Sequence, residues 1–368
     1  MEKEIPETSC DIPIRLDNQP LIESVEVDLP VPSLSDNAAD LDRLARSLSQ
    51  KGFSPIRIAP GKMNEFVGKM RENDLRFRAV VGYTGRDWEV LDVVALSPDA
   101  PVLGFGLDLG TSTLVLRLID IARKKTIREV LVKNPQAAHG EDILSRIIFA
   151  GDAGGLGILR RLLVEACSDA MEKMLRDSGV SALCVYALSC AGNTAISHFF
   201  WGLDPSNICR EPYIPAANTF PIVRAAELGF DFLPNSLLYL FPNVGSYVGG
   251  DIISGVIAAG LNRSDGVRML IDVGANAEIV LGNCDWLLAC AGAAGPALEG
   301  GVVERGMQAM AGAIDSVRID RKTLEPEFQV IGGGKASGIC GSGLIELVAE
   351  MFSSKIVNIQ GKFTTGLN

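Results

Sequence analysis

Apolar and polar positions alternate with two different periods along the chain, and this pattern predicts an α/β protein. Residues 25–29 alternate with a period of two, as in a half-buried strand, and residues 39–48 carry apolar side chains at helical spacing. Ser35 or Asp36 stands where the N-cap of that helix is expected. The same patterns predict a strand, a helix and a hairpin: 55–58, 62–71, and 77–83 with 88–96.

These elements divide the chain into three expected parts. Residues 1–24 are polar and proline-containing, which is typical of a linker. Residues 25–100 are expected to form a small α/β middle domain that closes at the turn-forming run 97–101. Residues 101–368 continue to alternate strand-like and helix-like runs, and 47% hydrophobic residues over 368 positions are enough for a sizeable core.

A glycine-rich turn between two apolar runs is the first candidate site. Residues 102–105 and 114–119 read as strands, and Asp108 precedes the turn between them. Backbone N–H groups and hydroxyls in such a turn can contact phosphate oxygens, while the carboxylate holds a hydrated divalent cation. The residues expected to contact phosphate are Gly106, Gly110, Thr111, Ser112 and Thr113. An ordinary glycine-rich hairpin would explain this stretch about as well.

Two later turns add polar residues near predicted helix starts. Glu141 and Asp142 precede a helix, where acidic side chains ordinarily complement the helix dipole, and we favour that interpretation over a catalytic one. The apolar strand at 182–190 runs into Asn193 and Thr194, at the carboxyl end of the sheet, where α/β proteins bind ligands. Capping of the following helix is an alternative that does not exclude ligand binding.

The turn motif then occurs a second time. Residues 249–251 open an apolar helix expected at 252–261, and an apolar run leads from there into Asp272, a glycine turn and another apolar strand. Asp272 follows Asp108 by 164 residues (272 − 108). Two phosphate hairpins at this separation are what two similar lobes would need to hold one nucleotide between them.

Composition narrows the choice of partners and compartment. A net charge of −11 argues against nucleic acid, whose binding rests on Lys and Arg. Eight cysteines without any C-x-x-C pair indicate a reducing cytoplasm, with neither a disulfide framework nor a metal site. His139 and His198 lie far apart in sequence and are expected to be structural.

Nothing in the sequence predicts a membrane segment. The chain starts without a secretory signal pattern. The apolar window 237–261 is interrupted by Pro242 and Asp251, which favours a buried strand followed by a helix. Residues 204–234 have little periodicity and are expected to be a connecting region or a partner-facing surface.

The two hairpins resemble the phosphate motifs of the acetate and sugar kinase, heat-shock chaperone and actin superfamily. This resemblance implies an actin-like (ribonuclease H-like), two-lobed ATPase domain in which Asp108 and Asp272 hold Mg²⁺ indirectly. Gly274 and Asn276 would contact phosphate from the second hairpin. Asp251 would position the attacking water, at a place where the chaperones carry Glu.

Further stretches carry a more specific resemblance: 32–36 with 40–44, 134–136 with 140–147, 192–194, 289–300 and 338–345. Together they are similar to the reductive activators of corrinoid proteins, over nearly everything from residue 25 to the end. The resemblance implies an ATP-dependent activase that returns an inactive Co(II) corrinoid, carried by a methyl-carrier protein, to the Co(I) nucleophile. It adds Gly292 and Gly295 to the residues expected to bind the cofactor.

Three departures from that family pattern shape the expectations. No cysteines have ferredoxin-type spacing, so no iron–sulfur cluster is expected here and the ferredoxin-type electron donor would lie on another protein or a missing segment. The chain stops at Asn368 before the expected adenosine motif, so the second lobe is expected to be truncated. Ala275 and Ala277 replace residues that are often Thr and Gly, which weakens phosphate contact or slows hydrolysis.

Two other functions stay open at this point. One is an activase of a radical dehydratase or aryl-CoA reductase, which would hold a cluster between two subunits through Cys290 and Cys340. The other is a nucleotide-binding interaction module without turnover. A homodimer is left open, and the sequence does not identify the corrinoid protein.

Overall fold

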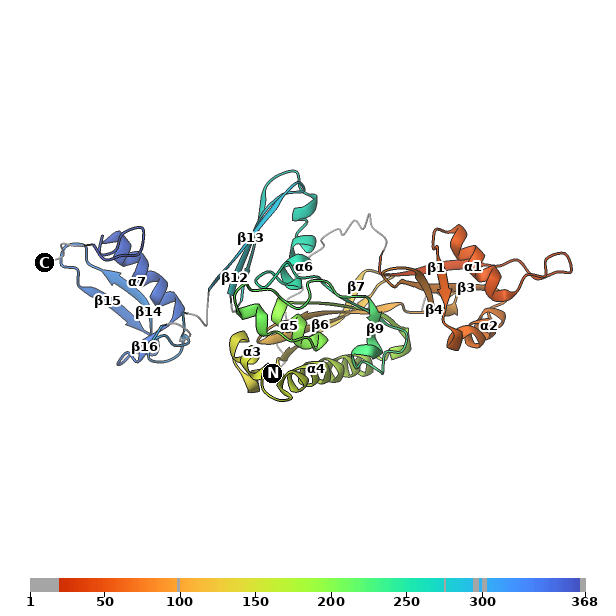
Figure 1. Cartoon of the computed structure of the whole chain (residues 1–368), viewed down its shortest axis with the longest axis horizontal. Helices are drawn as coiled ribbons and strands as arrows, with labels where there is room; N and C mark the ends of the chain where they lie inside the picture. The colour runs from red at the N-terminus through yellow and green to blue at the C-terminus, as the bar shows by residue number, and fades with distance from the viewer. Residues whose placement is uncertain (1–19, 98–99, 275, 294–297, 300–302, 365–368) are drawn as a thin grey trace. The chain divides into compact units, whose positions relative to one another are not determined.

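The computed structural model describes residues 20–97, 100–274, 276–293, 298–299 and 303–364 (Figure 1). The chain divides into two compact units, Met1–Gly260 and Leu261–Asn368. Each unit contains two sheets of its own.

A four-stranded sheet with two helices forms the N-terminal part of the first unit. Its elements are β1 (Ile22–Asp28), α1 (Asp40–Gln50), β2 (Ile56–Ile58), α2 (Met63–Glu72), β3 (Arg76–Tyr83) and β4 (Trp88–Ala95). The strand order is β1-β3-β4-β2. Helical spacing puts Leu44 and Leu48 of α1, and Phe66 and Met70 of α2, on the sides of their helices that are fully buried in one core. The elements expected from periodicity in this part are confirmed.

Two details at the start of this sheet differ from the expectation. β1 begins at Ile22, inside the segment whose composition predicted a linker. Neither Ser35 nor Asp36 caps α1, because the N-cap is Ala39 and makes no side-chain hydrogen bond. Instead, the buried Arg43 donates to the backbone carbonyls of Pro30, Asp36 and Ala38 in the segment between β1 and α1, and it pairs with the Asp36 carboxylate. A buried guanidinium thus fixes the loop that a cap was expected to fix.

A six-stranded sheet follows, in the order β7-β6-β5-β8-β10-β9. Its strands are β5 (Leu103–Leu109), β6 (Thr113–Asp120), β7 (Lys125–Lys133), β8 (Val185–Gly192), β9 (Val223–Arg224) and β10 (Leu237–Leu240). Strands β5, β6 and β7 form an antiparallel meander. β8 runs parallel to β5, and β10 runs parallel to β8. The carboxyl ends of β5, β8 and β10 therefore lie along one edge of the sheet.

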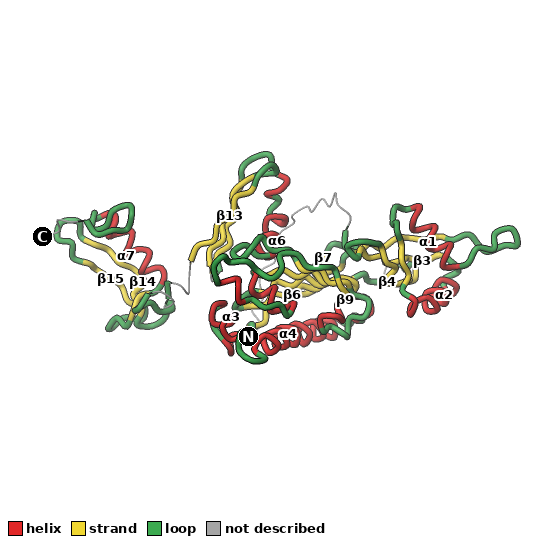
Figure 2. The backbone as a smooth tube through the Cα atoms, in the orientation of Figure 1, coloured by secondary structure: helices red, strands yellow, loops and turns green. Residues whose placement is uncertain are grey.

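Helices cover this sheet and supply its core. They are α3 (Ile143–Ala150), α4 (Gly155–Ser178), α5 (Thr194–Trp201) and α6 (Gly250–Ala258). The long helix α4 contacts β6 and β7 (Figure 2). Its apolar stripe, which includes Leu159, Leu163 and Met174, is buried against the sheet. The apolar window at 237–261 comprises β10 and α6, and no helix in the described part of the chain is long and apolar enough to cross a membrane.

Part of the segment 204–234 belongs to the core and is more than a connection. Leu228, Phe230 and Leu233 are buried in the same cluster as the side chains of the sheet and α4. The segment contributes only the two-residue strand β9 and short 3₁₀ turns. Such short elements leave no periodic pattern, and for that reason the sequence did not predict their burial.

A buried polar contact joins the two sheets of the first unit. The Asp92 carboxylate of β4 accepts hydrogen bonds from Lys69 Nζ at 2.6 Å and from the hydroxyl of Tyr186, on β8, at 3.0 Å. Burial raises the pKa of Tyr186, and the charge of Asp92 raises it further, so the phenol stays protonated as a donor. Arg224 pairs with Glu89 across the same boundary. The four-stranded sheet is therefore fixed to β8 and β9 by charged hydrogen bonds as well as by apolar packing.

The second unit contains two three-stranded sheets. The first consists of β11 (Arg268–Val273), β12 (Asn276–Gly282) and β13 (Leu287–Ala293), in that order and antiparallel. The second has the order β15-β14-β16 and packs against α7; its elements are β14 (Ala313–Ile319), β15 (Pro326–Val330), β16 (Gly338–Ile339) and α7 (Gly341–Ser353). Gly343 allows α7 to approach β14, because a Cβ there would lie 2.3 Å from the carbonyl oxygen of Ile314.

Removal of the Tyr186 hydroxyl should weaken the first unit. We expect Tyr186→Phe to lower the free energy of unfolding by about 1–3 kcal/mol, because a buried carboxylate loses a hydrogen-bond donor. Chemical denaturation followed by tryptophan fluorescence would measure the change. Tyr213→Phe, at an exposed tyrosine, is the matched control and should be neutral. Equal stability of the two variants would contradict the role given to Tyr186.

Candidate functional site

The first candidate hairpin joins β5 to β6, and its turn is closed by a close backbone approach. The antiparallel register leaves residues 110–113 as the turn. A Cβ on Gly110 would lie 2.3 Å from the carbonyl oxygen of Thr113, so any other residue would force the turn apart. Asp108 is exposed near the end of β5, and Ser112 is exposed at the tip of the turn. The carboxylate and the hydroxyl are therefore accessible to a ligand.

Asn134 braces this turn from the end of β7. Its side-chain Nδ2 donates to the carbonyl oxygen of Gly110 at 2.9 Å, and its backbone N–H donates to the carbonyl oxygen of Ser112 at 2.9 Å. Its Oδ1 accepts from the backbone N–H of Gln136, and the side chain is fully buried. Sequence reasoning named Asn134 only as part of the stretch 134–136, which carries the family resemblance. The sequence signal that could have identified it is an asparagine placed directly after a strand that pairs with the hairpin.

A buried arginine, Arg146, forms hydrogen bonds with residues that follow Asn134 in the chain. The Arg146 guanidinium donates to the carbonyl oxygen of Gly140 at 2.7 Å and to Gln136 Oε1 at 3.4 Å. Asp142 caps α3, since its carboxylate accepts from the backbone N–H and the hydroxyl of Ser145. The interpretation of Asp142 as a helix-end residue is therefore confirmed. Residues 140–147 therefore form a platform that supports the segment after Asn134, and Asn134 holds the turn.

The end of β8 reaches the same turn from the other side. In the parallel pairing of β5 with β8, Leu109 lies opposite Gly192, so Asn193 follows directly beside the turn. Asn193 caps α5 through Oδ1, which accepts from the backbone N–H of Ile196 at 3.0 Å. Its Nδ2 donates to the hydroxyl oxygen of Thr111 at 3.1 Å. Both expectations for Asn193, a cap and a place near the ligand edge, agree with this geometry.

The start of α6 completes the cluster. A Cβ on Gly249 would lie 2.4 Å from Cα of Asn193 and 2.7 Å from the carbonyl oxygen of Gly192, so α6 begins in backbone contact with the end of β8. That Cβ would also lie 2.7 Å from Asp251 Oδ1. Thr194 donates from its hydroxyl to the carbonyl oxygen of Gly245 at 2.7 Å, which ties α5 to the loop before α6. Asp251 is thereby held at the edge that carries Asn193.

The structure thus gathers most of the residues that the sequence proposed for the first lobe. Thr111, Asn193 and Asp251 lie at one edge, and Asp108 pairs in register with Ala191, two residues before Asn193. Hydroxyls, backbone N–H groups and two carboxylates at the carboxyl end of a sheet suit a phosphate group with a hydrated cation. Gly106 lies within β5 and not in the turn, so it is the member of the set farthest from the tip.

The second candidate hairpin joins β11 to β12 and differs from the first. Asp272 lies opposite Glu278 and Val273 lies opposite Ala277, so the turn has three residues, 274–276, against four in the first hairpin. Partial burial raises the pKa of Glu278, and the charge of Asp272 raises it further. Sequence reasoning did not single out Glu278. Directly paired strand residues share a face, and this would have placed its carboxylate beside Asp272.

The other residues that the sequence predicted around the second hairpin differ in where they lie. The backbone N–H of Gly274 donates to the carbonyl oxygen of Asn276 at 2.8 Å, which closes the turn. Gly292 lies on β13 opposite Ala277. Gly295 and Ala275 lie outside the described residues. Because the two hairpins belong to separate units, the placement of one nucleotide between them stays a prediction.

The two cysteines considered as cluster ligands have different surroundings. Cys290 is exposed on β13, whereas Cys340 is buried at the N-terminus of α7, with its Sγ 3.3 Å from the carbonyl oxygen of Ile314. Within the described residues, no group of three or more His, Cys, Asp or Glu side chains could hold a metal ion.

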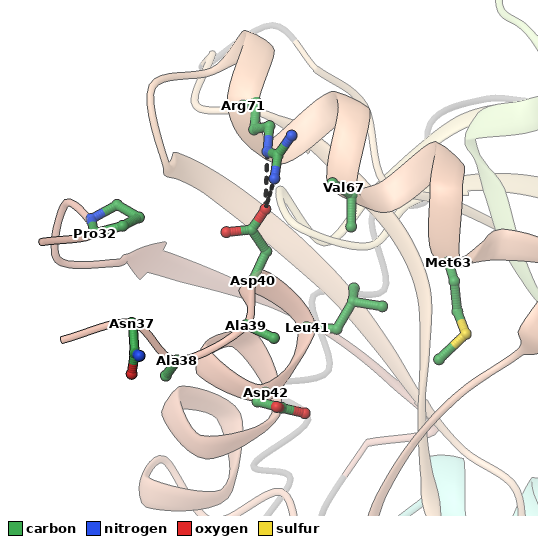
Figure 3. Close-up of a pocket in the computed structure, with 10 residues that line it drawn as sticks. All are labelled: Pro32, Asn37, Ala38, Ala39, Asp40, Leu41, Asp42, Met63, Val67 and Arg71. Atoms are coloured by element: carbon green, nitrogen blue, oxygen red, sulfur yellow. Dashed lines mark hydrogen bonds and ion pairs between the residues drawn. The ribbon is translucent and has the colours of Figure 1, made fainter. Parts of the chain in front are cut away.

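The first unit also has a hollow in its four-stranded part, and neither hairpin contributes to it. It is lined by residues of α1, α2 and the loop before α1 (Figure 3). Asp40 and Arg71 pair across it at 2.8 Å. The other side chains lining it are mostly small or apolar, so it offers little chemistry.

His198 has a structural role, as expected. It is fully buried on α5 and its Nδ1 lies 2.7 Å from the carbonyl oxygen of Thr194, while the backbone N–H of Ala217 donates to Nε2 at 3.3 Å. A carbonyl and an N–H on opposite ring nitrogens fix the neutral tautomer with its proton on Nδ1. Burial lowers the pKa of His198, although its backbone hydrogen bond opposes the shift.

Comparison with known proteins assigns nearly the whole chain to one family. Three family models match consecutive segments: the RACo linker region at residues 13–99, the RACo middle region at 103–264, and the C-terminal domain of RACo, the ASKHA domain, at 266–368. The chain belongs to the RACo family of reductive corrinoid activators. It therefore has a mixed α/β fold with an actin-like C-terminal domain, as the hairpin motifs predicted.

Individual relatives of this RACo chain agree with the assignment. It is 28% identical over 269 residues to the corrinoid activation enzyme RamQ of Eubacterium limosum, covering 73% of this chain and 45% of RamQ. It is 26% identical over 292 residues to the [Co(II) methylated amine-specific corrinoid protein] reductase of Methanosarcina barkeri, covering 72% and 53%. A solved reductive activator for corrinoid, iron–sulfur protein has 37% identity and a TM-score of 0.70, with 95% of this chain and 56% of that chain covered. The chain thus spans about half the length of these relatives.

The two hairpins should respond differently to the same substitution. We expect Gly110→Ala to lower the free energy of unfolding by about 1–3 kcal/mol, because the new methyl group would press on the backbone of Thr113. Gly274→Ala is the matched control and should change it by no more than about 0.5 kcal/mol, because the nearest atom that a Cβ at this position would meet is 3.9 Å away. Urea unfolding would measure both. Equal losses would contradict the difference between the turns.

Acid should destabilise the first unit through His198. Because the pKa of His198 is lower in the folded protein than its ordinary value of 6.5, the unfolded state binds the proton more readily. The contribution of His198 is therefore fully present above pH 6.5 and is lost as the pH falls toward the lowered folded pKa. Urea unfolding between pH 7 and pH 5 should show a shallower pH dependence in His198→Gln than in the wild type. An equal pH dependence in the variant and the wild type would contradict the assignment.

Proposed function

We propose that this chain takes part in the ATP-dependent reductive activation of a corrinoid methyl-carrier protein, from Co(II) to Co(I). The family assignment supports the reaction class, since its relatives are named as activation enzymes or reductases of corrinoid proteins. The observation that carries the nucleotide part is the hairpin turn at 110–113, which Asn134 and Asn193 brace beside Asp251. A turn held in this way keeps its donors in place for a phosphate group.

The residues at this edge fit a nucleotide phosphate with Mg²⁺. The turn offers three hydroxyl side chains, Thr111, Ser112 and Thr113, on a backbone that glycine keeps close. Asp108 is exposed at the strand end, as an indirect ligand of a hydrated cation should be. Asp272, with Gly274 and Asn276, would serve the second phosphate contact. Binding of ATP, or hydrolysis of its terminal phosphoanhydride bond, would favour the change of conformation.

Asp251 would orient the attacking water. Its backbone position is set by the contact of Gly249 with the end of β8, so the carboxylate comes from a rigid helix start and not from a loop. A carboxylate held in this way can accept a hydrogen bond from water and take up its proton. This role rests on the chaperone resemblance and on the place of Asp251 beside Asn193.

Cobalt reduction needs one electron, which a low-potential donor would supply to the carrier. Co(II) accepts that electron and becomes Co(I), and the reduction is unfavourable with ordinary donors. Nucleotide binding would contribute by favouring a conformation in which the electron transfer is less costly. The chain would therefore position and gate the carrier, and the corrinoid would hold the chemistry.

An interaction module that binds nucleotide without turnover is the second candidate. The shorter second turn favours it, and so does Ala275, which stands where the family often has the hydroxyl of a threonine. The two functions differ in whether ATP is consumed.

Formation of Co(I) tests the main proposal. The protein would be mixed with Mg·ATP, a corrinoid carrier in the Co(II) state and a low-potential reductant, and the Co(I) absorption followed. We expect Co(I) to accumulate with ATP and not without it. The same rate without ATP would overturn the proposal, and a requirement for nucleotide without phosphate release would favour the interaction module.

Substitution of Asp251 should separate binding from hydrolysis. Asp251→Asn should leave the affinity for Mg·ATP nearly unchanged and lower the rate of phosphate release by about 100-fold or more, because the water loses its proton acceptor. Calorimetry would measure the affinity and a phosphate assay the rate. Asp231→Asn, at an exposed aspartate, should match the wild type in both. An unchanged rate in Asp251→Asn would remove this residue from the mechanism.

A further inference from the structure

The side chain of Asn193 connects the first turn of α5 to the hairpin turn. Its Oδ1 lies 3.0 Å from the backbone nitrogen of Ile196, and its Nδ2 lies 3.1 Å from the hydroxyl oxygen of Thr111. Asn193 and Thr111 are both half-buried, 82 residues apart in sequence. The contact therefore exists only because β8 is parallel to β5 and ends beside the turn.

The positions of the protons follow from simple donor and acceptor rules. A backbone N–H can only donate, so the amide oxygen of Asn193 must face Ile196 and its NH₂ group must face Thr111. The Thr111 hydroxyl therefore accepts in this contact, and its own single proton points elsewhere. A hydroxyl that accepts from an amide is also a more polarised donor, because linked hydrogen bonds strengthen one another.

The backbone of the turn is fixed independently of Asn193. Asn134 donates to the carbonyl oxygen of Gly110 and, through its backbone, to that of Ser112, on either side of Thr111. These bonds orient the peptide groups of the turn, but they do not touch the Thr111 hydroxyl. The direction in which that hydroxyl donates is left to Asn193.

We propose that Asn193 is a positioning residue that acts on a nucleotide phosphate through the hydroxyl of Thr111. This inference rests on the proposed nucleotide site and changes the expected role of Asn193 from a direct phosphate contact to an indirect one. By accepting from Asn193, the Thr111 oxygen keeps its proton available for an anionic phosphate oxygen. Pre-orientation of the donor lowers the ordering cost when the ligand binds.

A double-mutant cycle tests the proposal. Calorimetric titration would measure the binding of a non-hydrolysable ATP analogue, in the presence of Mg²⁺, to each variant. Asn193→Ser keeps a good helix cap and removes the amide donor, and Thr111→Val removes the hydroxyl at nearly constant shape. We expect Thr111→Val to weaken binding about 10-fold, as for one hydrogen bond to a charged group, and Asn193→Ser to weaken it several-fold. The double variant should bind no more weakly than Thr111→Val alone. Thr111→Ser keeps the hydroxyl and should restore both the affinity and the sensitivity to Asn193→Ser.

Each outcome of the calorimetric titration decides one point. Losses that add in the double variant would overturn the inference, because Asn193 would then contact the ligand by itself. Unfolding by urea provides the second readout: Asn193→Ser should unfold with nearly wild-type stability, and an affinity loss accompanied by an equal loss of stability in all variants would also overturn it. Absence of analogue binding to the wild type would overturn the proposed function and this inference with it.

Discussion

The hydrogen bonds that hold the turn at 110–113 are the constraint on which the candidate site in the first unit depends. A buried amide that left its donors unpaired would cost free energy, so Asn134 can be fully buried only while the carbonyl of Gly110 is in place to accept from it. In the same turn, a Cβ on Gly110 would lie 2.3 Å from the carbonyl oxygen of Thr113, so a glycine is needed there. The turn, the end of β7 and the platform around Arg146 therefore form one interdependent structure.

Two glycines allow α6 to begin in close contact with the end of β8 and with the loop after β10. Gly249 lets α6 begin against the backbone of Gly192 and Asn193, and a Cβ on Gly250 would lie 2.7 Å from the carbonyl oxygen of Phe241. Both glycines have too little room for a side chain, so their role is steric and not a matter of unusual dihedral angles. The position of Asp251 at the candidate site is thus a consequence of backbone packing between α6, β8 and the loop after β10.

The two hairpins share a motif but not a local structure. Both place an aspartate near the end of the first strand, yet the second turn has one residue fewer and pairs Asp272 with Glu278. In the first hairpin the strand position paired with the aspartate is Val115, so the direct pairing of two carboxylates is a feature of the second hairpin. A cation would relieve the repulsion between Asp272 and Glu278.

Sequence alone determined the elements with clear periodicity, the two Asp-glycine hairpins and, through whole stretches such as 140–147, the family. Those features are local, since strand alternation, helical spacing and turn glycines act within a few residues of each other. Only the tertiary structure decided the partners of Asn134, the burial of Phe230 and the contact of Asn193 with Thr111. These depend on strand order and on distances between segments far apart in the chain, which no local pattern encodes.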